Sequence, residues 1–235
     1  MLQKPDDLPP FRLSNIFNEL QYVFTIVLFT TPILAAYGIW ITPLQATTFW
    51  WSFTVGTPRH RAYNASTPLD YFLAFMGTGA VEGSIHWWAR GHRAHHRYTD
   101  TNLDPYGAHN GLLWSHIGWM IIKPRRNPGV ADISDLRKNP VIKFQHRFYL
   151  PLIILMGFVF PTVVAGLGWN DWRGGFYYAA VAHLVFVHHS TFCVNSLAHW
   201  LGEASFDNKM TPRVHFITAL VTVGECYHNF HHQFP

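Results

Sequence analysis

The sequence predicts an all-α integral membrane protein, and three observations support that class. The chain has 235 residues, of which 49% are hydrophobic and 13% are charged, whereas about 25% are charged in an ordinary soluble domain. Several long runs contain no charged residue. The chain also carries 16 histidines against two cysteines, which suggests a metal held by imidazoles and excludes a secreted domain stapled by disulfides.

The composition excludes other classes as well. A chain this apolar is not intrinsically disordered. Its 17 Lys and Arg are barely offset from 13 Asp and Glu, too small a basic excess for a nucleic-acid-binding protein. Asp6 and Asp7 precede the first apolar run, and no small-residue cleavage pattern follows, so the start is not a secretory signal.

Three uncharged runs are long enough to cross a bilayer, which takes about 20 apolar residues. They cover residues 20–42, 148–168 and 176–196. Any one of them could be a buried helix of a soluble protein, but three in a chain of this length favour a membrane. A fourth apolar run, 47–56, has only ten residues and can hardly cross alone.

The distribution of Lys and Arg predicts the orientation. Twelve of them lie within 57–147, one (Arg173) lies in the turn at 168–175, and none lies at 43–46. By the positive-inside rule, both termini and the segments 57–147 and 197–235 are cytosolic. This topology requires the short run to cross, which conflicts with its length.

Histidines gather in the two segments predicted to be cytosolic. Each segment has three of them at positions i, i+3 and i+4, which share one face of a helix and can converge on a metal. Asn195 and His199, four residues apart, emerge together from the end of the last span. The six spaced histidines are His92, His95, His96, His228, His231 and His232.

The number of these histidines indicates two metal ions. With His199 there are seven, too many for one ion of four to six ligands. Imidazole suits iron, copper, zinc or nickel, so the spacing does not name the metal. Asp100 and Asp104 are candidates for orienting imidazoles, although either could equally cap a loop.

At these motifs the chain resembles the membrane fatty acid desaturases, in particular the acyl-CoA desaturases of the stearoyl-CoA Δ9 type and their fungal branch. The resemblance is carried by WARGHRAHHRY at 88–98, NSLAHW at 195–200 and GECYHNFHH at 224–232. It implies a single membrane domain over 1–235, with four transmembrane helices under a cytosolic helical cap, two Fe2+ ions, and no catalytic residue beyond the metal ligands. The implied ligands are His60, His92, His95, His96, His199, His228, His231 and His232, with Asn195 acting through a water.

The resemblance also implies an activity in unsaturated fatty acid biosynthesis. The expected reaction forms a Δ9 cis double bond in a saturated fatty acyl-CoA, using O2 and electrons from cytochrome b5 and its reductase, at the endoplasmic reticulum membrane. Arg90 and Lys123 are candidates for the CoA phosphates. Trp88, Phe192 and Trp200 are candidates for the wall of an acyl tunnel, with ordinary membrane packing as the alternative.

The chain departs from the family pattern in its first histidine box, HxxxxH. His60 matches the second histidine, but the first falls on Val55, next to the shortened run. Cys226 stands where the family has Gly. Fungal members often carry a C-terminal cytochrome b5 domain, which this sequence does not include. The electron donor is therefore expected to act in trans. An impaired or inactive paralogue or fragment, and a related diiron hydroxylase, remain alternatives.

The remaining histidines lack ligand spacing. His188 lies within a predicted span and is interpreted as a hydrogen-bonded helix contact. His86 is six residues before the first spaced histidine, off that helix face, and is not expected to replace the lost ligand. The others are interpreted as structural: His109, His116, His146, His183 and His215.

Overall fold

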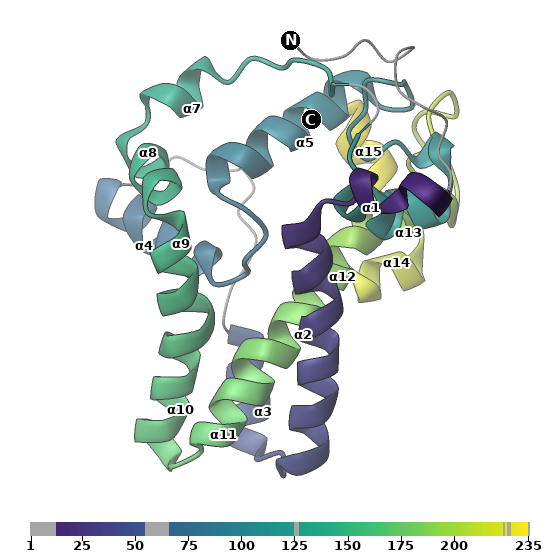
Figure 1. Ribbon diagram of the computed structural model, residues 1–235. Helices are drawn as coiled ribbons and strands as arrows, with labels where there is room; N and C mark the ends of the chain where they lie inside the picture. The colour runs from purple at the N-terminus through teal and green to yellow at the C-terminus, as the bar shows by residue number, and fades with distance from the viewer. Residues whose placement is uncertain (1–12, 55–65, 125–126, 223, 225–226, 235) are drawn as a thin grey trace. The chain divides into compact units, whose positions relative to one another are not determined.

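The computed structural model describes residues 13–54, 66–124, 127–222, 224 and 227–234. These described residues are helical, with two isolated β-bridges and no strand, which confirms the all-α class. Figure 1 shows the elements in chain order. The α-helices are α1 Ile16–Glu19, α2 Tyr22–Ile41, α3 Ala46–Thr54, α4 Thr67–Thr78, α5 Ile85–Tyr98, α6 Trp119–Ile121, α7 Ser134–Lys138, α8 Pro140–Arg147, α9 Tyr149–Ile153, α10 Phe160–Trp169, α11 Trp172–Gly174, α12 His183–Asn195, α13 Leu197–Trp200, α14 Phe216–Val221 and α15 His228–Gln233.

Shorter helical segments of other types interrupt this series. Two are 3-10 helices, η2 Leu13–Asn15 and η3 Ala108–Asn110. Three are π-helices, η4 Trp114–Gly118, η5 Ile154–Val159 and η6 Gly175–Ala182. The sequence did not predict the π-helices, because hydrophobic runs set the length of a helix and not its hydrogen-bond register.

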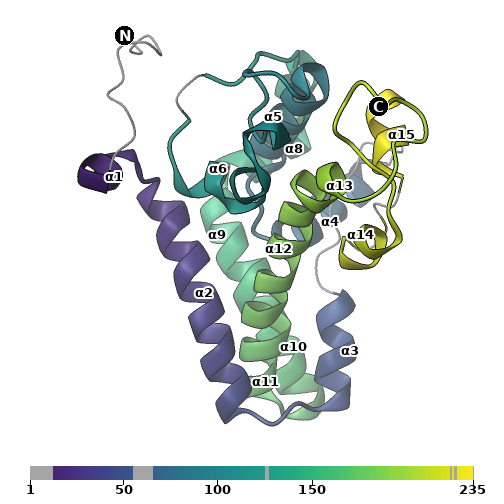
Figure 2. The ribbon, with the colours of Figure 1, turned by 90° about the vertical axis from the view of Figure 1, so that its right-hand side faces the viewer.

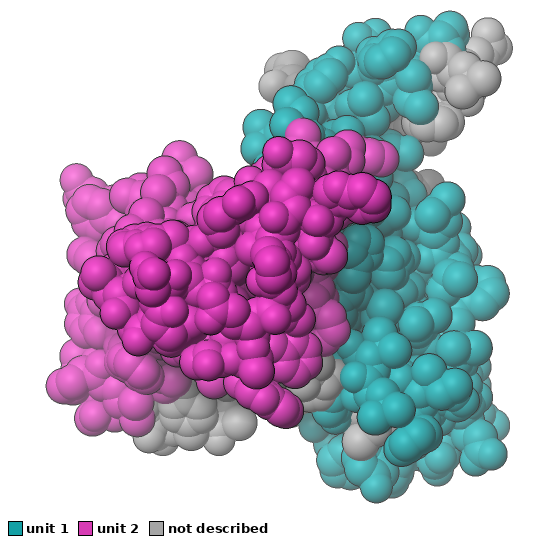
Figure 3. Space-filling view, turned by 90° about the horizontal axis from the view of Figure 1, so that it is seen from below, with its two compact units in different colours: residues 1–27, 91–132, 189–235 teal, residues 28–90, 133–188 magenta. Residues whose placement is uncertain are grey.

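The chain divides into two compact units, coloured in Figure 3. Unit 1 contains residues 1–27, 91–132 and 189–235, and unit 2 contains residues 28–90 and 133–188. The segments of each unit are far apart in the sequence, so each unit is closed by long-range contacts.

Two described helices are long and apolar enough to cross a membrane. They are α2, and the continuous helix Tyr149–Trp169 formed by α9, η5 and α10, and they agree with the expected runs 20–42 and 148–168. Only 17% and 28% of their apolar windows are buried. A core helix of a soluble protein would be mostly buried, so their exposed apolar surfaces favour contact with lipid.

The other two apolar runs are also helical. The run 176–196 lies within one continuous helical stretch, made of α11, η6 and α12. The described part of the short run forms the nine-residue helix α3, which rises about 14 Å. That is about half of a bilayer's hydrocarbon thickness, and residues 55–56 of the run lie outside the described residues.

Within unit 2, α3 lies beside η6 and α10, an arrangement that Figure 2 shows in side view. A buried carboxylate fixes it. Thr48 of α3 donates to Asp171 Oδ2 at 2.5 Å and accepts from Trp169 Nε1 at 2.8 Å. Asp171 Oδ1 accepts from the backbone N–H of Gly174 at 2.9 Å. The shortened helix is therefore anchored by polar contacts that do not depend on its length.

A second buried polar group holds the other part of unit 2. Gln145 of α8 is 1% exposed. Its amide nitrogen donates to Thr78 of α4 at 3.0 Å, and its amide oxygen accepts from the backbone N–H of Ile85 at 3.0 Å. Buried amides are stable only when both ends are paired, so Gln145 fixes α4, α8 and the start of α5 together.

Unit 1 is closed at its N-terminal segment by backbone pairing. Gln21 N–H donates to the Ile121 carbonyl at 2.8 Å, and Lys123 N–H donates to the Glu19 carbonyl at 2.8 Å. The Gln21 side chain donates to the carbonyls of Trp119 and Ile122 at 3.0 and 3.1 Å. The segment entering α2 is thereby held to the segment that follows η4.

Candidate metal centre

Three helices of unit 1 bring together seven histidines, which are the three of each HxxHH box and His199. Helix α5 contributes three of them, the short helix α13 contributes His199, and α15 contributes three more. Their ring nitrogens form two groups, each of which could hold a metal ion. His60, the eighth expected ligand, lies outside the described residues.

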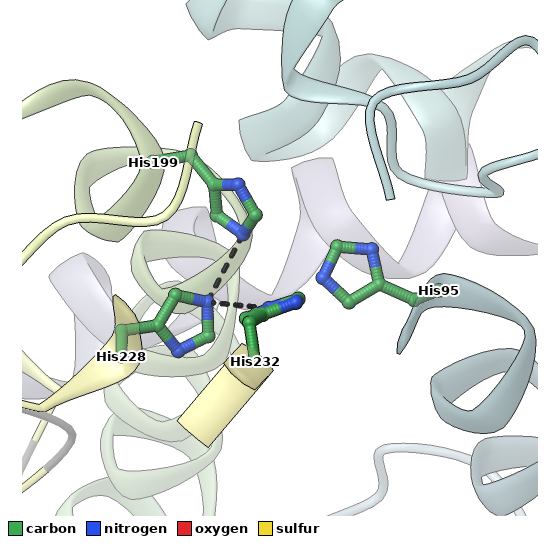
Figure 4. A group of neighbouring side chains, drawn as sticks. All are labelled: His95, His199, His228 and His232. Carbon is green, nitrogen blue, oxygen red and sulfur yellow. Dashed lines mark hydrogen bonds between the residues drawn. The ribbon is translucent and has the colours of Figure 1, made fainter. Parts of the chain in front are cut away.

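The first group is buried and has four members, shown in Figure 4. We call it the buried group: His95, His199, His228 and His232. One nitrogen from each ring lies within 4.8 Å of those from the others. His228 Nε2 lies 3.0 Å from His199 Nε2 and 3.1 Å from His232 Nε2. No member is more than 7% exposed.

The second group is half-buried and has three described members, which we call the half-buried group: His92, His96 and His231. The Nε2 atoms of His92 and His96 lie 3.1 Å apart. The His231 ring centroid lies 4.5 Å from that of His96 and 5.8 Å from that of His92. The two groups adjoin, because the rings of His96 and His232 stack at 4.4 Å between centroids.

Each histidine box is divided between the two groups, in opposite senses. In α5, the residues at i and i+4 (His92 and His96) join the half-buried group, and His95 at i+3 joins the buried group. In α15, His228 and His232 join the buried group and His231 joins the other. Each box therefore contributes imidazoles to both groups.

Helical geometry explains the division. Successive residues turn by about 100° around the axis, so i and i+4 differ by about 40°, whereas i+3 and i+4 differ by about 100°. The i, i+4 pair can serve one ion while the i+3 side chain serves its neighbour. In α5 the i, i+4 pair belongs to the half-buried group, whereas in α15 it belongs to the buried group. With His199, this gives four members in the buried group and three in the half-buried group.

Hydrogen bonds fix which nitrogen of the buried rings carries the proton. His95 Nδ1 lies 2.9 Å from Asp104 Oδ1, and a carboxylate only accepts, so Nδ1 is the donor. Thr99 donates its hydroxyl proton to the His95 carbonyl at 2.7 Å. Its oxygen, 3.2 Å from His232 Nδ1, therefore accepts from that nitrogen. In both rings Nε2 is left with a lone pair.

These lone pairs fit a metal better than they fit one another. His95 Nε2 is buried and has no hydrogen-bond partner among the described residues. His228 has a single Nε2 proton at most, so it cannot satisfy both His199 Nε2 and His232 Nε2. Burial, and secondarily the neighbouring imidazoles, lowers the pKa of His199, His228 and His232 well below the ordinary range. The rings are thus neutral near pH 7, which is the form that binds metal.

Other predicted site residues lie in both units. Asn195 is buried and ends α12. Phe192 is 4% exposed, with its ring 5.8 Å from that of His116 and 6.1 Å from that of Trp119. Trp200, another candidate for a tunnel wall, is 53% exposed, so the described residues do not enclose it.

The remaining candidates for substrate contacts are less buried. Lys123 Nζ donates to the Asn18 carbonyl at 2.8 Å. Trp88 is half-buried and Arg90 is exposed, and both belong to unit 2.

The histidines interpreted as structural have partners other than the two groups. His188 Nε2 lies 3.2 Å from the Val81 carbonyl, as expected of a helix contact. The His86 ring lies 4.9 Å from that of His146. His116 bridges Ser196 Oγ at 3.0 Å and His189 Nδ1 at 3.1 Å, a contact that no spacing in the sequence predicted.

Sequence reasoning missed the threonines that touch the buried rings. Thr99 stands four residues after His95, and that helical spacing could have pointed to it. Thr211, whose Oγ1 lies 2.8 Å from His199 Nδ1, lies in a loop with no periodic signal. Asp104, predicted as an orienting residue, does contact an imidazole.

Comparison with known proteins identifies the relatives of this arrangement. The sequence model described as "Fatty acid desaturase" matches residues 59–235. A "Probable acyl-CoA desaturase" of Schizosaccharomyces pombe is 49% identical over 96% of this chain, and "Acyl-CoA desaturase 1" of Saccharomyces cerevisiae is 42% identical over 96%. A "Stearoyl-CoA desaturase" of Sus scrofa is 34% identical over 92% of the chain and 66% of its own length. The chain spans about half the length of the two fungal relatives, 50% and 48%.

Proposed function

The chain belongs to the fatty acid desaturase family, and on that premise we propose that it is a membrane acyl-CoA desaturase. The proposed reaction forms a cis double bond of the Δ9 type in a saturated fatty acyl-CoA, with O2 as the oxidant. The observation that carries the proposal is the pair of adjoining histidine groups, because such groups can hold two redox metal ions side by side.

The proposed cofactor is a pair of Fe2+ ions. The ligands would be the four histidines of the buried group and the three of the half-buried group, with His60 completing the latter and Asn195 acting through a water. Iron in this setting would supply the oxidising power, drawn from O2, that removing hydrogen from an unactivated methylene requires and that no side chain provides.

The protein's own residues would hold and shield that centre. Asp104 and Thr99 keep Nδ1 of His95 and His232 protonated and Nε2 directed inward, so the ligand atoms are oriented before metal arrives. The buried group is almost inaccessible to solvent, which keeps water away from a reactive site. Phe192 is well placed to form part of an apolar wall, and Trp88 and Trp200 would extend it.

The proposed location is the endoplasmic reticulum membrane, with four spans. The helices α2, α9–η5–α10 and α11–η6–α12 would cross fully, and α3 would form the incomplete second span. The histidine groups and both termini would face the cytosol, where the Lys and Arg residues concentrate. The proposed partners are lipid, fatty acyl-CoA (with its phosphates near Arg90 and Lys123), and cytochrome b5 with its reductase.

An impaired chain is the second candidate, because one specific observation favours it. Helix α3 has only nine residues, and the expected first ligand of the first box falls on Val55. A chain with this defect would keep the fold and one complete histidine group while losing most turnover. A diiron hydroxylase is a third reading, distinguished by its product.

Product analysis tests the proposal. The chain would be expressed with cytochrome b5 in a desaturase-deficient yeast, with its second span rebuilt to a full HxxxxH ending at His60. We expect unsaturated acyl chains by gas chromatography and mass spectrometry. The matched control is His228→Ala in the rebuilt chain, which should form none. A hydroxylated product, or unsaturated product from the control, would contradict the proposed activity.

A further inference from the structure

We propose that Thr211 and Asp100 are a pair of positioning residues that fixes the tautomer and orientation of His199, and that Asn229 holds the loop that carries Thr211. The loop comprises residues 203–214, between α13 and α14. The inference rests on the proposed metal centre and extends it to residues that no histidine spacing reveals.

The proton count along this chain of contacts has one solution. Thr211 Oγ1 donates its single proton to Asp100 Oδ1 at 2.5 Å, since a carboxylate can only accept. Thr211 Oγ1 must then accept from His199 Nδ1, 2.8 Å away. With its proton on Nδ1, His199 presents an Nε2 lone pair, and this nitrogen lies 3.0 Å from His228 Nε2.

Asp100 lies shortly after the histidine box of α5 and binds the loop there. It lies two residues after the end of α5 and has φ of 61°, a left-handed conformation that Asp and Asn adopt more readily than most residues. Its Oδ2 accepts from the backbone N–H of Thr211 at 2.6 Å. Both carboxylate oxygens are thus used on one loop residue, so Asp100 sets the position of Thr211 as well as its hydroxyl proton.

Asn229, within the histidine box of α15, fixes the same loop. Its side chain is 1% exposed and makes four hydrogen bonds to loop backbone. The amide oxygen accepts from the N–H groups of Phe206 and Asp207 at 2.7 and 3.0 Å, and the amide nitrogen donates to the carbonyls of Asp207 and Pro212 at 2.8 and 2.9 Å. Asn229 follows His228 directly in the chain, so the hydrogen bonds of Asn229 also hold the loop beside His228.

The ends of the loop are closed by backbone pairing. Glu203 and Val214 exchange hydrogen bonds at 3.0 and 2.8 Å. Gly202, with φ of 110°, permits this closure, because a Cβ there would lie 2.1 Å from the Val214 carbonyl oxygen. The loop is therefore a braced element, and Thr211 is its contact with the buried group.

Losing the Thr211 hydroxyl should weaken metal binding specifically. Without an acceptor, His199 Nδ1–H would be buried and unpaired, and the ring would favour the tautomer with its proton on Nε2, which has no lone pair at Nε2 for a metal. Removing a group that orients a metal ligand typically lowers metal affinity by about 10- to 100-fold. A valine has nearly the shape of threonine, so packing is kept.

The test measures Co2+ affinity and its visible absorption in the full chain purified in detergent. We expect Thr211→Val to lower the affinity of the tightest Co2+ site by about 10- to 100-fold. It should also alter the d–d absorption spectrum of the bound Co2+. Thr211→Ser should stay within a few-fold of the parent chain. Thr222→Val is the matched control, because the Thr222 hydroxyl is also buried and donates only to its own helix, to the Thr218 carbonyl.

A double-mutant cycle separates positioning from general loop stability. Asp100→Asn keeps the volume and tolerates the positive φ, and should weaken Co2+ binding by about tenfold in the parent chain. In the Thr211→Val background, Asp100→Asn should cause no further loss of Co2+ affinity, since both changes disrupt the same hydrogen-bonded chain from Asp100 through Thr211 to His199. Fully additive losses would overturn the inference, and so would equal Co2+ affinities of Thr211→Val and the parent. A parent chain that binds no Co2+ would instead overturn the metal centre itself, and the inference with it.

Discussion

The two histidine groups differ in what surrounds them. The buried group has four members from three helices, and Asp104, Thr99 and Thr211 contact three of its rings at Nδ1. The half-buried group has three described members from two helices, and its rings contact one another and those of the buried group. The HxxHH motifs supply members to both groups, and hydrogen-bonding partners outside those motifs orient three rings of the buried group.

This contrast gives the expected order of metal binding. The buried group has four imidazoles, and three of them have Nδ1 hydrogen-bonded to an oxygen, so that Nε2 is the atom presented to a metal. Under the proposed ligand set the half-buried group would also take ligands from the first box, which keeps His60 and has Val55 at the position expected for its other histidine. The chain as written should therefore hold its first ion tightly and its second weakly, and each experiment below tests that difference.

The largest effect is expected from repairing the half-buried side. A second span rebuilt with a full HxxxxH ending at His60 should change growth of a desaturase-deficient yeast, without added unsaturated fatty acid, from little or none to robust. Under the proposed ligand set the unrepaired chain would lack one ligand of the first box, so water and uncoupled oxygen chemistry should compete. Cytochrome b5 is supplied in trans, and membrane expression of both chains is confirmed.

Robust growth with the unrepaired chain would contradict this expectation. Another ligand would then have taken the empty place, and His86 and His188 would be the first to test by substitution. Their present contacts, with the His146 ring and the Val81 carbonyl, argue against that outcome.

A matched pair of ligand substitutions should separate the two groups. His228→Ala removes a member of the buried group, and His231→Ala removes a member of the half-buried group three residues away on the same helix. Loss of a ligand should exceed the 10- to 100-fold typical of losing an orienting partner, so we expect His228→Ala to weaken the tight Co2+ site by more than about 100-fold. His231→Ala should leave that site within a few-fold of the parent, measured by competition with a chelator. Equal effects of the two changes would show that the groups bind as one site.

Metal removal should proceed in two phases. Dialysis of the iron-loaded chain against a chelator should release the ion of the half-buried group first, because its described ligands are more accessible to solvent. The buried ion should persist about tenfold longer or more. Iron per chain, followed by mass spectrometry against time, reports this directly. A single phase would contradict the difference in burial as the determinant of release.

The smallest effect is expected at Asp104. Asp104→Asn keeps an oxygen to accept from His95 Nδ1 but removes the negative charge, so tight Co2+ binding should weaken by about tenfold. The matched control is Asp207→Asn, at a loop residue whose carboxylate accepts only from the Lys209 N–H among the described contacts. No change with Asp104→Asn would mean that the imidazole is oriented by packing alone.

The sequence by itself determined the fold class, the desaturase family and seven of the histidines that meet in the structure. Runs without charge predict helices that face lipid, and histidines spaced at i, i+3 and i+4 predict a shared helical face. Both patterns lie within a single segment of the chain, so the sequence alone shows them. The sequence also has Val55 where the family pattern predicts a histidine, at a position outside the described residues.

Only the tertiary structure decided how those histidines are shared. Whether His95 joins His92 or His228 depends on where α15 meets α5, more than 130 residues away in the chain. The same holds for Thr211, which reaches His199 only because Asp100 and Asn229 fix its loop. Contacts of this kind leave no periodic signal, since each depends on packing between distant segments and not on spacing along one helix.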